Sequence, residues 1–161
     1  MKAQSLVEAS PARVVADADV LAAALLVGGT PRDALDMLRA HSWTTLVVSN
    51  PLLDDVEAIV ASLATSKLAS DWRAKLAEWA DIVDHPDADH PALASAYHGG
   101  AMQLLSLDPS LTGVQTGVGL QDRLPVSIRE PAAFCAVFSP ERLYPVVVGG
   151  SYPGPDRDAR W

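Results

Sequence analysis

Short apolar runs of strand type alternate along this chain with longer segments of helical periodicity. Strand-type runs are expected at 13–18, 44–49, 102–107 and 126–128, and helical patterns fill most of the intervals between them. Strands that are joined through helices pair in parallel, and the helices then cover both faces of the sheet. The sequence therefore predicts an α/β fold, a three-layer α/β/α sandwich around a central parallel sheet.

A chain of 161 residues is long enough for one domain with its own hydrophobic core. We expect a flexible N-terminus over residues 1–12, the α/β domain over 13–138, and a C-terminal extension over 139–161, where Pro and Gly become frequent. The longest apolar run, Val20–Val27, is too short to cross a bilayer, and the first residues lack the layout of a secretory signal. A cytoplasmic protein without membrane contact is the resulting prediction.

The formal net charge is −8, and the acids are mostly Asp while the bases are mostly Arg. A strongly negative surface with little lysine stays hydrated in concentrated salt, so we expect a halophilic source, most naturally an archaeon. The same acidity argues against a broad surface that tracks phosphates, because nucleic-acid affinity normally rests on Lys and Arg. A nucleic-acid substrate would have to be held by a few arginines and by metal ions.

Two aspartates directly follow apolar strand-type runs. Asp17 comes after Val14-Val15-Ala16, and Asp108 comes after the run 102–107. The carboxyl ends of parallel strands meet at one edge of a sheet, so we expect both side chains at that edge. Carboxylates brought together repel one another unless a cation or shared protons offset their charge. Oxygen-only ligands of this kind suit Mg²⁺ or Mn²⁺.

Simpler roles exist for the same acids. Asp19 stands where it would cap the helix that follows, and Asp89 could do the same for a later helix. Asp108-Pro109 is typical of a turn. Asp17 is harder to explain in this way, because Asp19 already supplies the expected cap.

Five segments of the chain resemble, in the correct order, the motifs of PIN domains. The motifs are a first strand ending in Asp, a second strand followed by a helix with an acid, a segment with a third acid, a strand ending in Ser-x-Asp, and a closing strand followed by a Pro-x-x-Phe helix start. In this chain the five motifs correspond, in the same order, to Val15–Leu21, Ser49–Val56, Asp89–Ala96, Leu104–Asp108 and Val126–Phe134. The resemblance covers residues 13–138.

The resemblance implies a PIN-like fold and a Mg²⁺- or Mn²⁺-dependent nuclease, a hydrolase that cleaves RNA phosphodiesters. Its catalytic acids would be Asp17, Asp55, Asp89 and Asp108. Of these, the metal ligands would be Asp17, Asp89 and Asp108. The supporting residues would be Asp19, Ser106 and His90.

The chain departs from the PIN pattern at three of these positions. The usual Glu on the third helix is Asp55, with Asp54 beside it, and the usual Asn after the first Asp is Asp19. His90 stands where the third acid aligns most naturally, with Asp89 one residue earlier. These changes either retune the choice of metal or mean that catalysis is lost. Two functions therefore stay open: an active ribonuclease, and a catalytically degenerate PIN-like domain that acts as a binding or regulatory module.

The segment His85–His90 also resembles, superficially, the His-x-His-x-Asp-His motif of metallo-β-lactamase-like zinc hydrolases. Asp87 replaces the second histidine, and that fold needs a longer chain, so we interpret His85 as a surface or capping residue. Arg123 and Arg129 flank the last strand and are the first choices for a phosphate contact. RNA is the expected partner, while a homodimer, an antitoxin-like protein or another partner stays open.

Overall fold

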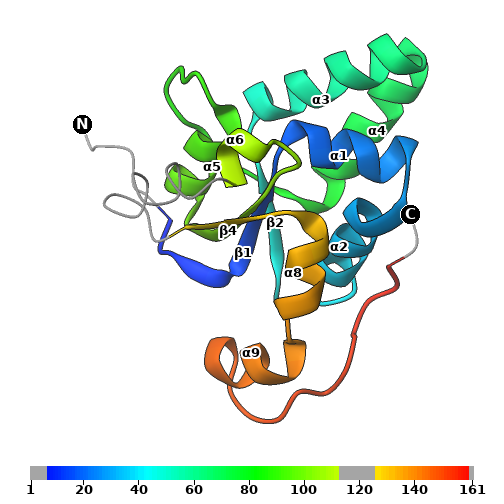
Figure 1. Cartoon of the computed structure of the whole chain (residues 1–161). Helices are drawn as coiled ribbons and strands as arrows, with labels where there is room; N and C mark the ends of the chain where they lie inside the picture. Colours follow the sequence, from blue (N-terminus) through cyan, green and yellow to red (C-terminus); the bar gives the residue numbers. More distant parts are fainter. Residues whose placement is uncertain (1–6, 113–125, 160–161) are drawn as a thin grey trace.

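The computed structural model describes residues 7–112 and 126–159 and contains a five-stranded sheet in which every pairing is parallel (Figure 1). The strands are β1 (Ser10–Ala16), β2 (Thr45–Val48), β3 (Asp81–Ile82), β4 (Ala101–Leu105) and β5 (Ser127–Arg129). Their spatial order is β3-β2-β1-β4-β5. The chain moves outward from β1 to β3 and then returns to the other side of β1. The strand order therefore reverses between β1 and β4, where sheets of this kind open a crevice at their carboxyl edge.

Helices cover both faces of the sheet, which confirms the predicted α/β sandwich. The described helices are α1 (Ala18–Leu26), α2 (Gly29–Arg39), α3 (Asn50–Leu63), α4 (Ser66–Trp79), α5 (Pro91–Gly99), α6 (Pro109–Thr112), α8 (Pro131–Val137) and α9 (Pro140–Val147). On one face α2 packs against both α1 and α8, and on the other face α5 lies against β1, β2 and β4 (Figure 1). α3 contacts α1 and α4, so the pair α3–α4 forms an outer wall beside the sheet.

The central strands are buried because helices lie on both of their faces. Val14, Val15 and Ala16 of β1 have no exposed surface, and the apolar residues of β2 and the end of β4 are equally buried. The outer helix pair is tied to this core through Trp72 of α4, whose buried indole donates a 2.9 Å hydrogen bond to the carbonyl of Leu21 in α1. No helix in the described part of the chain is both long and apolar enough to span a membrane.

Several element boundaries differ from the sequence predictions. β1 begins at Ser10, inside the predicted flexible N-terminus, because the Ser10 amide donates to the carbonyl of Gly100 next to β4. α2 begins at Gly29 after a Gly28 cap with φ of 83°. The two-residue strand β3 lies where the sequence predicted no strand. The helix α4 stops at Trp79, and Asp81 and Ile82 then pair with the edge of β2.

The C-terminal extension, predicted to be loosely ordered, runs as α9 and then along the junction between α2 and β2. The Tyr152 hydroxyl lies 2.6 Å from Nε2 of His41. His41 Nδ1 lies 2.7 Å from the Met37 carbonyl and must donate to it, so Nε2 is the acceptor for Tyr152. Asp156 accepts hydrogen bonds from the amide and the hydroxyl of Ser42. These contacts hold the extension to the buried His41 turn.

Candidate functional site

Asp17 sits at the carboxyl end of β1, in the crevice next to β4. Its amide donates to the Leu105 carbonyl at 2.8 Å, so the strand pairing continues through Asp17 itself. Its side chain caps α1, because Oδ1 accepts from the Ala18 amide at 2.8 Å. Its other oxygen, Oδ2, accepts a 3.3 Å hydrogen bond from the Ser106 hydroxyl. Asp17 is therefore held both at the start of α1 and by the end of β4.

Asp19 is not the helix cap that the sequence suggested, because the backbone is already helical at Ala18 and Asp17 takes that role. Its Oδ2 instead accepts from the Leu107 amide at 3.2 Å, and its Oδ1 is buried without a hydrogen-bond partner in the described chain. Burial, the charge of Asp17 and, more weakly, that of Asp108 raise the pKa of Asp19, although hydrogen bonds from the backbone oppose the rise. An unpartnered carboxylate oxygen at this place is costly unless a cation or a water reaches it.

Asp108 follows β4 and has the turn geometry that its Asp-Pro sequence suggests. Oδ1 accepts from the Ser110 amide at 2.9 Å, and the Asp108 amide donates to the Ser106 hydroxyl oxygen at 3.0 Å. Hydrogen bonds from Ser110 lower the pKa of Asp108, and the nearby His90 lowers it further. Ser106, which is fully buried, thus bridges Asp17 and Asp108 through one hydroxyl.

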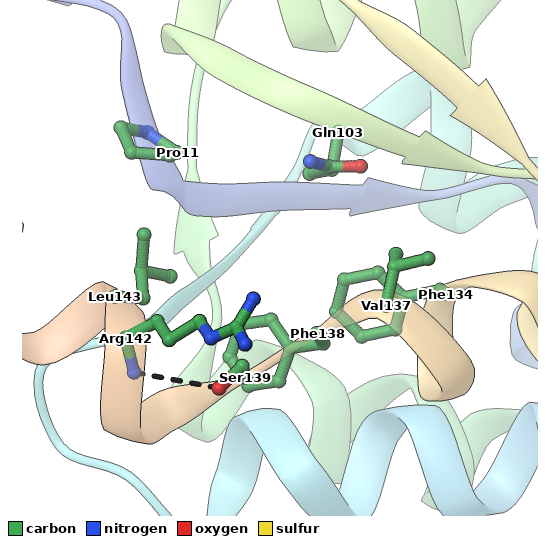
Figure 2. A pocket seen from close by; sticks show the side chains of 8 residues that line it. All are labelled: Pro11, Gln103, Phe134, Val137, Phe138, Ser139, Arg142 and Leu143. Atoms are coloured by element: carbon green, nitrogen blue, oxygen red, sulfur yellow. Dashed lines mark hydrogen bonds between the residues drawn. The ribbon is translucent and has the colours of Figure 1, made fainter.

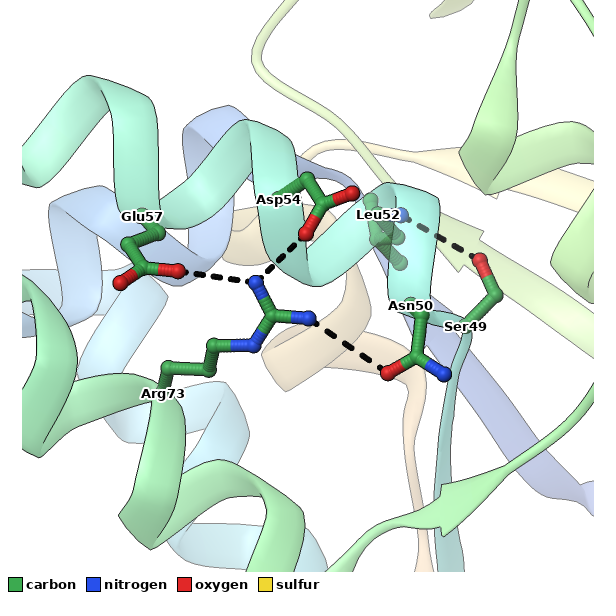
Figure 3. Close-up of polar contacts among 6 residues, drawn as sticks. All are labelled: Ser49, Asn50, Leu52, Asp54, Glu57 and Arg73. Atoms are coloured by element: carbon green, nitrogen blue, oxygen red, sulfur yellow. Dashed lines mark hydrogen bonds and ion pairs between the residues drawn. The ribbon is translucent and has the colours of Figure 1, made fainter.

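Asp55 lies in the first turns of α3. Partial burial raises its pKa, and the charges of Asp17 and then Asp54 raise it further. Its neighbour Asp54 points toward α4, where Arg73 holds it with a 2.6 Å ion pair (Figure 3). The same guanidinium nitrogen binds Glu57 at 2.8 Å. Of the two adjacent acids, Asp54 is therefore engaged by Arg73, and Asp55 forms no ion pair with another described residue.

His90 and Asp89 take different places. His90 is the residue before α5, its side chain makes no capping hydrogen bond, and its charge acts on Asp108. Asp89 is exposed, and no hydrogen bond or ion pair joins it to another described residue. The position of the predicted third acid is thus occupied by an imidazole, and the structure does not bring Asp89 into contact with the other three aspartates.

A buried polar network lies at the carboxyl end of β2, beside these acids. Ser49 caps α3 through a 3.3 Å hydrogen bond from the Leu52 amide, and its hydroxyl lies 2.8 Å from both Ser95 of α5 and Nε2 of His85. His85 Nδ1 lies 2.8 Å from the Pro86 carbonyl, so Nδ1 donates and Nε2 accepts from Ser49. Both ring nitrogens of His85 are therefore engaged within the described chain. This network could not be predicted from the sequence, because it joins three segments that are distant along the chain.

Oxygen-only donors in this crevice fit a hard divalent cation. No three His, Cys, Asp or Glu side chains among residues 7–112 and 126–159 are already placed to hold one ion together. Mg²⁺ commonly uses only one or two protein carboxylates and keeps several waters. The unpartnered Oδ1 of Asp19 and the mutual charge effects of Asp17, Asp19 and Asp55 are what such an ion would relieve.

A hollow of about 220 Å³ lies elsewhere, between the start of β1, the middle of β4, and the helices α8 and α9 (Figure 2). No aspartate of the described residues lines it. Arg129, predicted to contact a phosphate, turns toward this side, because its Nε donates to Gln103 of the hollow at 3.3 Å. Arg123, the other predicted phosphate contact, lies outside the described residues.

Comparison with known proteins gives one family. The model described as "Family of unknown function (DUF7384)" matches residues 8–160, so the chain belongs to this family. No curated protein matches the chain, and no solved structure does.

Proposed function

We propose that this member of the DUF7384 family is a Mg²⁺- or Mn²⁺-dependent phosphodiesterase of the PIN type that hydrolyses RNA. One observation supports the proposal: Asp17 and Asp108 follow the neighbouring strands β1 and β4, where the strand order reverses, and the charge of Asp17 acts on both Asp19 and Asp55. Such an accumulation of negative charge opposes folding unless it serves a ligand. The PIN resemblance supports the nuclease assignment, and the chain's expected cytoplasmic location would give access to RNA.

The residues can be given distinct roles. Asp17 and Asp108 would hold the ion, because they follow the ends of neighbouring strands and Ser106 joins the Asp17 carboxylate to the Asp108 backbone amide. Asp19 and Asp55 would hold waters around it through their remaining oxygens. When bound, the ion would supply charge stabilisation for the phosphate and an activated water. Because the chain is acidic, phosphate binding would depend mainly on the ion.

The test is cleavage of single-stranded RNA in Mn²⁺ at high salt. Asp17→Asn keeps an amide oxygen that can still cap α1 but removes the charge, so the variant should fold and lose metal-dependent cleavage. Asp71→Asn is the matched control, because Asp71 only pairs with the exposed Lys67 on α4. If the wild-type chain gives no metal-dependent products at any salt concentration, the nuclease proposal fails.

A second function is favoured by the imidazole at the third acid position. With the charge of His90 acting on Asp108, and with Asp89 exposed and without contact to the other aspartates, the site could bind an ion without turning over RNA. The chain would then be a binding or regulatory module. Saturable Mn²⁺ binding that Asp17→Asn removes, together with no cleavage, distinguishes this function from the first.

A further inference from the structure

The hollow between the sheet and helices α8 and α9 has a character unlike the aspartate crevice. Most of its lining is apolar, from Pro11, Phe134, Val137, Phe138 and Leu143. The rings of Phe134 and Phe138 stack at 4.9 Å with an interplanar angle of 26°, and Phe134 is buried, so Phe138 is the more accessible of the two rings. Its volume of about 220 Å³ is below the roughly 300–1,000 Å³ typical of sites for drug-sized ligands. Any ligand that fits is small.

The polar groups of the hollow are hydrogen-bond donors. Arg129 donates through Nε to Oε1 of Gln103, which fixes the orientation of the amide and leaves its NH₂ group for the hollow. Ser139 already accepts from the Arg142 amide and keeps its hydroxyl proton free to donate. Arg142 reaches into the same space from α9, opposite Gln103 (Figure 2). These three hydrogen-bond donors favour a ligand that is rich in hydrogen-bond acceptors.

The charge of Arg142 is unusual for its surroundings. The chain has 20 acids and 12 bases, and Arg13, Arg32 and Arg73 each form an ion pair with an aspartate. Within residues 7–112 and 126–159, the guanidinium of Arg142 forms no ion pair and no hydrogen bond. In a protein with this excess of acids, an unpaired arginine over an apolar hollow is a natural anion anchor.

We propose that this hollow binds a small organic carboxylate, with its anionic head on Arg142 and Gln103 and its flat apolar body against Phe138 and Leu143. A carboxylate fits better than a phosphate, because one planar guanidinium matches a planar carboxylate in a two-pronged contact and, among the described residues, no second cationic side chain lines the hollow. The site shares no residue with the aspartate crevice, so it stands whether or not the chain is a nuclease.

Benzoate is a suitable probe, with benzamide as an uncharged molecule of the same shape. Titration of the full chain, followed by NMR through the methyl groups of Val137 and Leu143, should give saturable shifts with a dissociation constant of about 1–10 mM for benzoate. Benzamide and inorganic phosphate should each bind about tenfold more weakly, because each lacks either the charge or the apolar body.

Variants separate a built site from chance binding. Arg142→Met keeps most of the side-chain bulk and should weaken benzoate binding about tenfold, with benzamide unchanged. Gln103→Leu should weaken it about threefold. Arg32→Met is the matched control, because Arg32 pairs with Asp36 on α2, away from the hollow. Equal benzoate affinity in the wild-type chain and Arg142→Met would mean an adventitious additive only, and tighter binding of phosphate than of benzoate, or no saturable shift, would overturn the proposal.

Discussion

The hydroxyl of Ser106 donates a 3.3 Å hydrogen bond to Oδ2 of Asp17 and thereby joins the ends of β4 and β1. These two strands are neighbours in space, but 89 residues separate Ser106 from Asp17 in the chain. The contact fixes an aspartate at the one place in the sheet where a crevice is expected from topology alone. The proposed chemistry and several predictions depend on this pair.

Replacing Ser106 by Ala should weaken metal-dependent activity without unfolding the chain. Ser106 is fully buried, donates to Asp17 and accepts from the Asp108 amide, so Ala leaves that amide unsatisfied and Asp17 less well oriented. We expect a loss of about 1–2 kcal/mol in the free energy of unfolding and a fall of about tenfold in cleavage rate. Urea denaturation and the RNA assay measure the two effects. An activity equal to that of the wild-type chain would show that Ser106 does not contribute to the site.

The two adjacent acids of α3 should behave differently. Asp55→Asn should reduce cleavage by about tenfold or more, because Asp55 is the acid of this pair on which the charge of Asp17 acts. Asp54→Asn should change cleavage by less than about twofold, because Asp54 is turned toward Arg73 and is largely exposed. Initial rates in saturating Mn²⁺ provide the measurement. The reverse order of effects would show that Asp54 and not Asp55 serves the crevice.

Stability should depend on pH through the crowded carboxylates. Burial and neighbouring charges raise the pKa of Asp19, and likewise that of Asp55, so the folded chain binds these protons more tightly than the unfolded chain. Their contribution to the free energy of unfolding is present below the ordinary pKa and is lost as the pH rises through the raised pKa.

Asp19→Asn should therefore be more stable than the wild-type chain at neutral pH, by roughly 0.5–2 kcal/mol, and the difference should shrink toward about pH 4. Adding Mn²⁺ should stabilise the wild-type chain more than the variant. Denaturation curves across this pH range test both statements, with Asp71→Asn as the control that keeps the wild-type pH dependence. A variant less stable than the wild-type chain at every pH contradicts this account.

Trp72 should be a strong determinant of stability. Trp72→Phe removes the hydrogen bond to the Leu21 carbonyl and leaves unfilled space between α1 and α4. We expect a loss of roughly 2 kcal/mol, seen in the denaturation midpoint. The control is Tyr97→Phe, since Tyr97 is partly exposed. Equal stability of the two variants would show that the outer helix pair does not depend on the indole.

The fold class follows from the sequence because each strand-type run is separated from the next by helical periodicity, and only parallel pairing satisfies that alternation. Edge strands are less visible. β3 has two residues, both exposed, and exists because the amides and carbonyls of β2 need partners on that side. Such a strand has no apolar pattern of its own from which it could be predicted.

The site was predictable in outline and not in detail. Asp17 and Asp108 were expected at the carboxyl edge, and the structure joins them through Ser106. Asp17, and not Asp19, caps α1, because the strand pairing with Leu105 extends through Asp17 and makes it the last residue before the helix. The ion pairs of Arg73, which engage Asp54 and not Asp55, link two helices. A single sequence does not reveal such contacts.

The proposed function requires a divalent cation between the ends of β1 and β4. A crystal grown with Mn²⁺ and measured for anomalous scattering would locate this ion. One strong peak is expected within about 2.2 Å of a carboxylate oxygen of Asp17, next to Asp108 and absent from crystals of Asp17→Asn. Crystals of the wild-type chain that show no peak in this crevice, or show Mn²⁺ bound only elsewhere, would contradict the proposed function.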